Sequence, residues 1–169
     1  QNAHAGARRV EGEVAAEVDS AERATLAGHE SLLLGESPTL TLTELAQRAG
    51  TSVEVAQKFW RAMGFADVQP DEVRFTDQDV AALQDTVALL DETSDSSLAS
   101  ASVLELLRAQ SYTMDRLVLW ELETFVTDLS ERLGLDDTAA RLVALDRIDG
   151  LVELLSRQLT YVWRRHMAS

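Results

Sequence analysis

The chain has 169 residues, and 46% of them are hydrophobic, which is enough apolar material for one folded domain with a core. It contains no cysteine, which excludes disulfides and thiolate metal sites. The net charge of −14, from 29 acidic and 15 basic residues, repels nucleic-acid phosphates and anionic lipid headgroups.

The composition predicts an all-α fold. Only 8 glycines and 2 prolines are present, which favours few turns and long helices. β-branched and aromatic residues form no alternating runs, so we expect no strands. No apolar run of about 18 residues could span a membrane, and the first residues lack the apolar centre of a signal peptide. We therefore expect a cytoplasmic protein.

Two regions of different character follow one another along the chain. Residues 1–38 form an N-terminal arm, in which residues 10–30, rich in Ala and Glu, predict a helix with a thin apolar stripe. Residues 39–169 predict a helical domain, with a helix-turn-helix-like part at 39–92 and a part made of long helices at 93–169.

Residues 39–92 carry the signals of three short helices. Thr43 is predicted to cap a helix over 44–49, and Gly50 to end it. Ser52 is predicted to cap a second helix that reaches Met63. Thr76 is predicted to cap a third that continues to about residue 92. A short helix, a glycine turn and a second helix are typical of a helix-turn-helix.

Binding of DNA by this unit is disfavoured on charge. The second helix offers Gln57, Lys58 and Arg61 as base or phosphate contacts. Residues 39–83, however, contain seven acidic and four basic residues, whereas phosphate binding requires a surplus of cations. A helix-turn-helix that serves as a packing scaffold is therefore favoured. The alternative stays open, because TLTELAQRAGTSVEVAQKFWRAMGF followed by FTDQDVAAL resembles the DNA-binding end of MerR-type transcription regulators.

Residues 93–169 predict long helices. After a turn at 93–97, Ser96 or Ser97 is predicted to cap an apolar helix over 98–133, with a bend or break at 110–112. Gly134 ends this segment, and Asp136 or Asp137 is predicted to cap a last helix that begins at Thr138 and loosens at Gly150.

The last helix ends on a titratable group. Its apolar stripe repeats at steps of three or four residues and comprises Leu151, Leu155, Leu159, Val162 and His166. Imidazole changes its charge between pH 5 and 8. A helix C-terminus favours the charged form, whereas Arg164 and Arg165 oppose it, so both directions of response stay open. Since the sequence begins at Gln1 and nothing terminates this helix, we expect it to continue into a further domain.

The C-terminal three quarters of the chain resemble a known family. Over about residues 39–169, the segment TLTELAQRAGTSVEVAQKFWRAMGFADV, the Leu-rich helices and the terminal QLTYVWRRHM are similar to the N-terminal regulatory domain of actinobacterial class III adenylate cyclases. The resemblance implies an all-α domain that forms an intertwined homodimer. It also implies that this domain precedes a catalytic domain and restrains it through its last helix. Activity would respond to acid pH, with His166 as the matching switch residue, or to a bound fatty acid.

The apolar face of 98–133 is the candidate lipid pocket. Its candidate lining residues are Leu107, Met114, Val118, Trp120, Phe125 and Leu129. The plainer interpretation is that such a stripe forms core or a dimer interface. The chain shows no catalytic motif, metal site or cofactor motif, so we expect no activity of its own. A helical protein-interaction module without a ligand is the third class of function.

Overall fold

The computed structural model describes residue 28 and residues 30–93, 95 and 97–169, and the chain divides into two units, Gln1–Ser37 and Pro38–Ser169. Nearly all of the helix predicted over 10–30 lies outside the described residues. In the first unit, residues 30–34 are helical, and Gly35 ends this helix with a φ of 74° and a hydrogen bond of 3.3 Å from its N–H to the carbonyl of Leu32.

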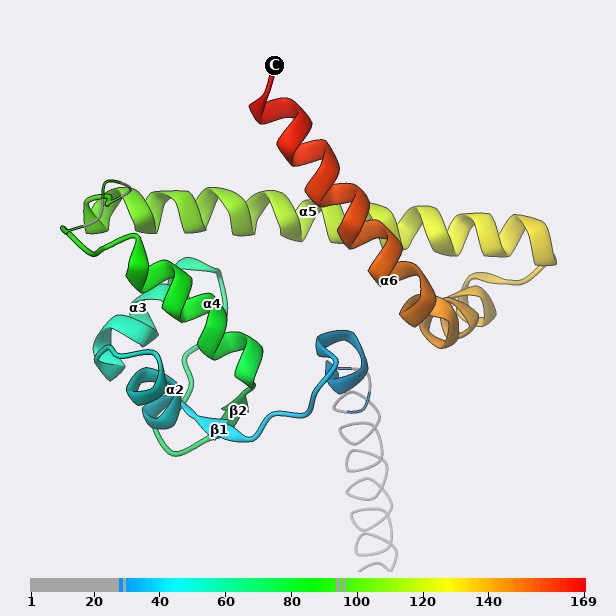
Figure 1. Ribbon diagram of the computed structural model, residues 1–169. Coiled ribbons are helices and arrows are strands. Elements are labelled where there is room, and N and C mark those ends of the chain that lie inside the picture. The colour runs from blue at the N-terminus through cyan, green and yellow to red at the C-terminus, as the bar shows by residue number, and fades with distance from the viewer. Residues whose placement is uncertain (1–27, 29, 94, 96) are drawn as a thin grey trace, which may run out of the picture. The chain divides into compact units, whose positions relative to one another are not determined.

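The second unit is mostly α-helical, as predicted, with one small sheet (Figure 1). Its elements in chain order are β1 (Leu40–Thr41), α2 (Leu42–Arg48), α3 (Val53–Ala62), β2 (Val73–Phe75), α4 (Asp77–Ala88), α5 (Ser100–Leu133) and α6 (Asp137–Met167).

Side-chain caps fix where the short helices begin. Ser52 and Thr76 accept bonds from the backbone N–H groups of Val55 and Asp79, as predicted. The predicted cap of α2 was wrong by two residues. Thr41, not Thr43, is the N-cap, because Glu44 lies three residues after it and completes a reciprocal capping box.

The expectation of a fold without strands was wrong in one place. β1 and β2 pair antiparallel, with Leu40 opposite Phe75 and Thr41 opposite Val73. Two and three residues are too short to show an alternating pattern. The pairing depends on residues more than 30 positions apart, of which Phe75 is fully buried.

The first core lies among β2, α2, α3, α4 and the start of α5. Its buried members are Leu42, Leu45, Ala46, Ala49, Ala56, Phe59, Val68, Phe75, Val80, Leu83 and Val103. Trp60 closes one side of it and meets Phe75 edge-on, with ring centroids 4.9 Å apart. The three short helices thus share a core with α5.

α5 is one continuous helix of 34 residues, so the predicted bend or break at 110–112 is wrong. The polar side chain in this stretch has a partner, since the hydroxyl of Ser111 donates to the carbonyl of Met63 at the end of α3. Capping by Ser97 is also wrong, because α5 begins after Ala99, with no side-chain cap. Ser96 lies outside the described residues. Gly134 ends α5 in the left-handed region, as predicted, with a φ of 64°.

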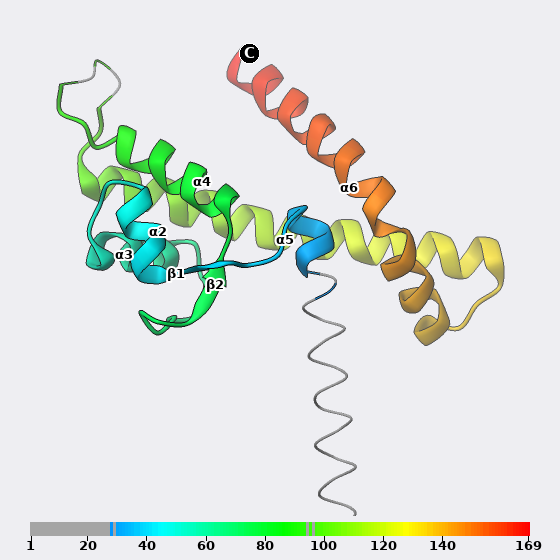
Figure 2. The ribbon, with the colours of Figure 1, turned by 60° about the horizontal axis from the view of Figure 1, so that its bottom comes forward.

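α6 packs across the second half of α5 and forms the second core (Figure 2). Its cap is Asp136, which accepts a 2.8 Å bond from the N–H of Ala139. Val126 and Leu129 of α5 meet Ala140 and Ala144 of α6, and all four are buried. Small side chains on α6 allow the two backbones to approach closely. α6 is helical through Gly150, so the predicted loosening there is not seen.

The second core predicts a strong effect of Leu129→Ala. Leu129 is 0% exposed, so its truncation should lower the free energy of unfolding by about 2–5 kcal/mol. Leu142→Ala on α6 is the matched control, because Leu142 is 65% exposed and should change stability by less than about 0.5 kcal/mol. Urea unfolding followed by circular dichroism measures both, and equal effects would contradict this assignment of the core.

Candidate functional site

Five of the six apolar candidate residues lie along one face of α5. Leu107 packs against the first core, and Phe125 and Leu129 belong to the second. Met114 and Val118 lie between them at the same helical spacing, yet they are 37% and 50% exposed. The stretch of this face between the two cores is therefore apolar and uncovered in the single chain.

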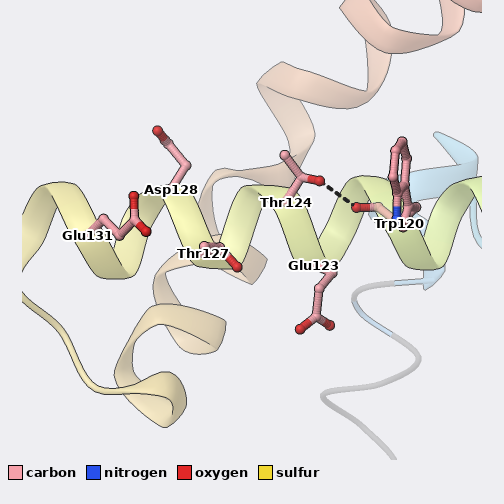
Figure 3. A pocket seen from close by; sticks show the side chains of 6 residues that line it. All are labelled: Trp120, Glu123, Thr124, Thr127, Asp128 and Glu131. Carbon is pink, nitrogen blue, oxygen red and sulfur yellow. Dashed lines mark hydrogen bonds between the residues drawn. The ribbon is translucent and has the colours of Figure 1, made fainter.

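The structure does not bring Trp120 together with the other five. Trp120 is 76% exposed and lines an open hollow of about 350 Å³ on another face of α5 (Figure 3). The remaining lining residues are Glu123, Thr124, Thr127, Asp128 and Glu131. Three carboxylates repel the carboxylate of a fatty acid, so this hollow is unsuited to one.

The apolar stripe of α6 is half-buried only in its first part. Leu151, Leu155 and Leu159 are partly buried, but Val162 is 41% exposed and His166 is exposed. The packing face of α6 therefore ends before the histidine. Residues 160–169 are all exposed, so the last turns of α6 lie beyond its packed part.

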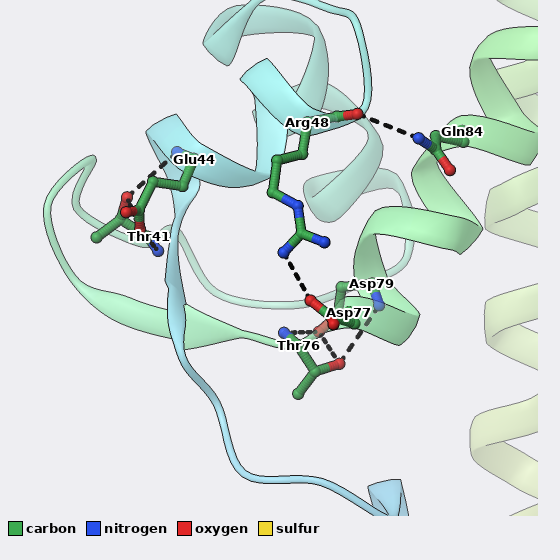
Figure 4. Close-up of polar contacts among 7 residues, drawn as sticks. All are labelled: Thr41, Glu44, Arg48, Thr76, Asp77, Asp79 and Gln84. Carbon is green, nitrogen blue, oxygen red and sulfur yellow. Dashed lines mark hydrogen bonds and ion pairs between the residues drawn. The ribbon is translucent and has the colours of Figure 1, made fainter.

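Charged side chains of α2 and α4 tie the short helices together (Figure 4). The guanidinium of Arg48 lies 2.6 Å from the Asp77 carboxylate, and the amide of Gln84 donates to the carbonyl of Arg48 at 3.1 Å. The backbone N–H of Thr41 donates to Glu44, which lowers the pKa of that carboxyl. These contacts fix the orientation of α2 and α4.

The candidate DNA-contacting side chains of α3 are held by carboxylates of the same unit. Arg61 donates to both oxygens of Asp67, at 2.5 and 2.7 Å, and Gln57 donates to Asp67 at 2.9 Å. Lys58 pairs with Glu54 at 3.0 Å. The bonds from Arg61 lower the pKa of Asp67 and raise that of Arg61. Contact with phosphate would require these pairs to separate.

Sequence reasoning missed two of these features. The pairing of Asp67 with Gln57 and Arg61 joins a loop to α3. Because Asp67 lies outside the helix, no helical spacing relates it to either partner. The hollow on α5 did leave a signal, because Glu123, Thr127 and Glu131 follow one another at steps of four residues. That spacing predicts one polar helix face.

No cluster of three or more His, Cys, Asp or Glu side chains suited to a metal ion occurs among the residues that the structure describes. In the same part of the chain, no helix is long and apolar enough to cross a membrane.

No family model matches the chain, but three curated proteins are similar to it. An adenylate cyclase of Glutamicibacter nicotianae is 32% identical over 156 residues, which are 92% of this chain and 38% of that protein. Adenylate cyclases of Streptomyces coelicolor and Streptomyces griseus are 34% and 32% identical over 142 residues, or 83% of this chain. These residues are 35% and 34% of the two relatives. The predicted resemblance to adenylate cyclases is confirmed, and the chain spans little more than a third of each relative.

The Asp67 contacts predict a pH-dependent effect of Asp67→Asn. Because the folded chain lowers the pKa of Asp67 from its ordinary 3.8, the stabilisation it provides is present above that pH and is lost as the pH falls through the folded value. The variant should melt below wild type at pH 7, and the difference should shrink on acidification below 3.8. Asp71→Asn, in the same loop, should match wild type throughout. A deficit that grows in acid would contradict the assignment.

Proposed function

The chain is a relative of adenylate cyclases that corresponds to about a third of their length, and from this premise we propose that it is a non-catalytic regulatory domain of such an enzyme. In this proposal the domain restrains a downstream catalytic domain of the same cytoplasmic protein and thereby controls production of cAMP. α6 is the element through which the restraint acts.

The observation that carries the proposal is the boundary within α6 between a packed part and the exposed last turns. Ala140, Ala144 and Ile148 are buried, whereas residues 160–169 are exposed. Leu151, Leu155 and Leu159 lie between, partly covered. A helix with such a boundary can gain or lose contacts over a few turns while its first half stays docked. It therefore provides two arrangements between which an effector can select.

Protonation of His166 is the first proposed effector. The side chain is exposed next to Arg164 and Arg165, in the last turns of α6. A catalytic domain or partner that covers this turn in one arrangement only would bind the two charge states of the histidine unequally. A difference of about 1.4 kcal/mol changes the ratio of the two arrangements tenfold.

A fatty acid is the second proposed effector. Met114 and Val118 offer an uncovered apolar stretch between two cores, and an acyl chain there would bury it. Each methylene removed from water contributes about 0.8 kcal/mol.

Homodimer formation is part of the proposal, because large apolar side chains of α5 and α6 remain exposed. Among the most exposed are Tyr112, Leu119, Trp120, Tyr161 and Met167, each more than 60% exposed. Monomeric proteins seldom leave such extensive apolar surface in water. A second copy would cover it.

The alternative is a MerR-like transcription regulator. Its support is the pair α2 and α3, joined by a turn at Gly50 with a φ of 73°. The carboxylate partners of Arg61, Gln57 and Lys58 oppose it. Salt-dependent binding to duplex DNA would favour this alternative over the cyclase proposal.

His166→Ala in the full-length cyclase tests the switch. We expect cyclase activity to lose most of its dependence on pH between 5 and 8, because no other described side chain in this turn titrates there. Gln158→Ala, an exposed change on the same helix, should leave the pH–activity curve as in wild type. An unchanged curve for His166→Ala would exclude this histidine as the switch.

Oleate tests the lipid proposal. Added oleate should raise the melting temperature of the chain, and Val118→Asp should abolish the rise by placing a charge on the uncovered stretch. Trp120→Ala should retain it, because Trp120 lies on another face of α5. The lipid proposal fails if oleate leaves the melting temperature unchanged and organic extraction of the purified protein yields no fatty acid.

A further inference from the structure

The last turns of α6 differ in charge from the rest of the molecule. Residues 154–169 contain three arginines, Arg157, Arg164 and Arg165, and no acidic residue. Because the whole chain carries −14, this segment has a net charge of +3 and all other residues together carry −17. The most basic stretch of the chain thus includes the exposed last turns of α6.

This end of α6 is also rich in exposed aromatic side chains. Tyr161 is 66% exposed and Trp163 is 58% exposed. Arg164 and Arg165 form no ion pair within the part of the chain that the structure describes. Tyr, Trp and Arg are the residues enriched at the centres of protein interfaces.

The outer face of α5 has the complementary character. We define it as Trp120, Glu123, Thr127, Asp128 and Glu131, which line one open hollow (Figure 3). It combines one exposed indole ring with three carboxylates. Asp128 already pairs with Arg132 at 2.6 Å, and Glu123 lies 4.0 Å from Arg141. Glu131 has no ion pair within the described residues.

A chain cannot place the basic end of its own α6 on this outer face. Leu129, which is fully buried beside α6, lies two positions from both Thr127 and Glu131. Residues two apart in a helix point in nearly opposite directions, so Thr127 and Glu131 are turned away from the α6 of the same chain. Glu123, at the edge of the face, does lie near the first turns of that α6, 4.0 Å from Arg141. Arg164, however, lies about 35 Å farther along α6 than Arg141, so the basic end and the outer face can meet only between molecules.

We propose that the basic, aromatic end of α6 docks on the acidic outer face of α5 of a second copy of this chain. The inference rests on the homodimer proposed above and specifies which surfaces form it. The contact is reciprocal, since each copy supplies one α6 end and one outer face, as a two-fold axis requires.

The sizes of the two surfaces match. The basic end, from residue 154 to 167, is about 20 Å long at 1.5 Å per residue, and the outer face, from Trp120 to Glu131, is about 17 Å long. Arg164 and Arg165 would face Asp128 and Glu131, while Tyr161, which lies on the same side of α6 as these arginines, would cover Trp120. Exposed ion pairs contribute little by themselves, so aromatic burial supplies the affinity and the charges select the register.

An anionic membrane is the main competing occupant of the basic end. The charge of −17 on the other residues opposes approach of the whole molecule to such a surface, whereas it favours a second copy with an acidic face.

A charge exchange between two variants tests the proposal. Variant A carries Arg164→Glu and Arg165→Glu, and variant B carries Asp128→Arg and Glu131→Arg. Homodimers of A or of B place like charges at both contacts, whereas the A–B pair has opposite charges at both. Analytical ultracentrifugation and native mass spectrometry measure the species formed by each variant alone and by the mixture.

We expect the dissociation constant of each homodimer to rise by roughly tenfold or more, and the A–B mixture to form a heterodimer with nearly the wild-type affinity. Asp71→Arg with Asp85→Arg, an equal change of charge at exposed positions outside α5, should leave the dimer intact.

Two results would overturn the docking. If variants A and B dimerise as wild type does, the dimer forms through another face and the docking proposal is wrong. The regulatory proposal is then unaffected, because cyclase activity tests it separately. If the wild-type chain is monomeric, both the docking and the proposed homodimer are wrong. Vesicles of phosphatidylserine and phosphatidylcholine provide a third arm. Binding that variant A loses, with no change in dimerisation, would assign the basic end to membranes instead.

Discussion

The continuity of α5 is the constraint on which the rest of this structure depends. One face of this helix carries Val103 in the first core and Leu129 in the second, about 39 Å apart along the axis at 1.5 Å per residue. The short helices and α6 therefore do not share a core, although both pack against α5. Bending α5 between the cores would change the geometry of both attachments at once.

The two attachments differ in kind. The unit of α2, α3 and α4 is fixed by a large aromatic and aliphatic core, by the Ser111 bond to α3 and by ion pairs such as that of Arg48 with Asp77. α6 is attached through few buried side chains, two of them the small Ala140 and Ala144, and its last turns are exposed. Low burial and a small core make local undocking easier, so α6 is the element most able to change its arrangement.

The distribution of charge favours an acidic protein surface over nucleic acid as a partner of this molecule. The cations of α3 are already held by Asp67 and Glu54, which leaves little attraction for nucleic acid. Arg164 and Arg165 at the end of α6 are not held in this way within the described chain, and Tyr161 and Trp163 next to them along the helix are exposed. The basic end thus has both the charge and the apolar area to join an acidic protein surface. The proposals on regulation, dimerisation and docking all depend on these exposed basic and aromatic side chains of α6.

The sequence by itself determined the helical class, the caps at Ser52 and Thr76, and the end of α5 at Gly134, because each depends on local backbone chemistry. It limited the cap of α6 to Asp136 or Asp137, and the structure has Asp136. The family resemblance was also readable from the chain. Only the tertiary structure decided the pairing of Phe75 with Leu40, the continuity of α5 at Ser111, and the separation of Trp120 from the rest of the apolar stripe. These depend on contacts between distant residues, which supply partners that no local pattern contains. In the same way, burial by α5 rather than helical period determines that the packing face of α6 ends before His166.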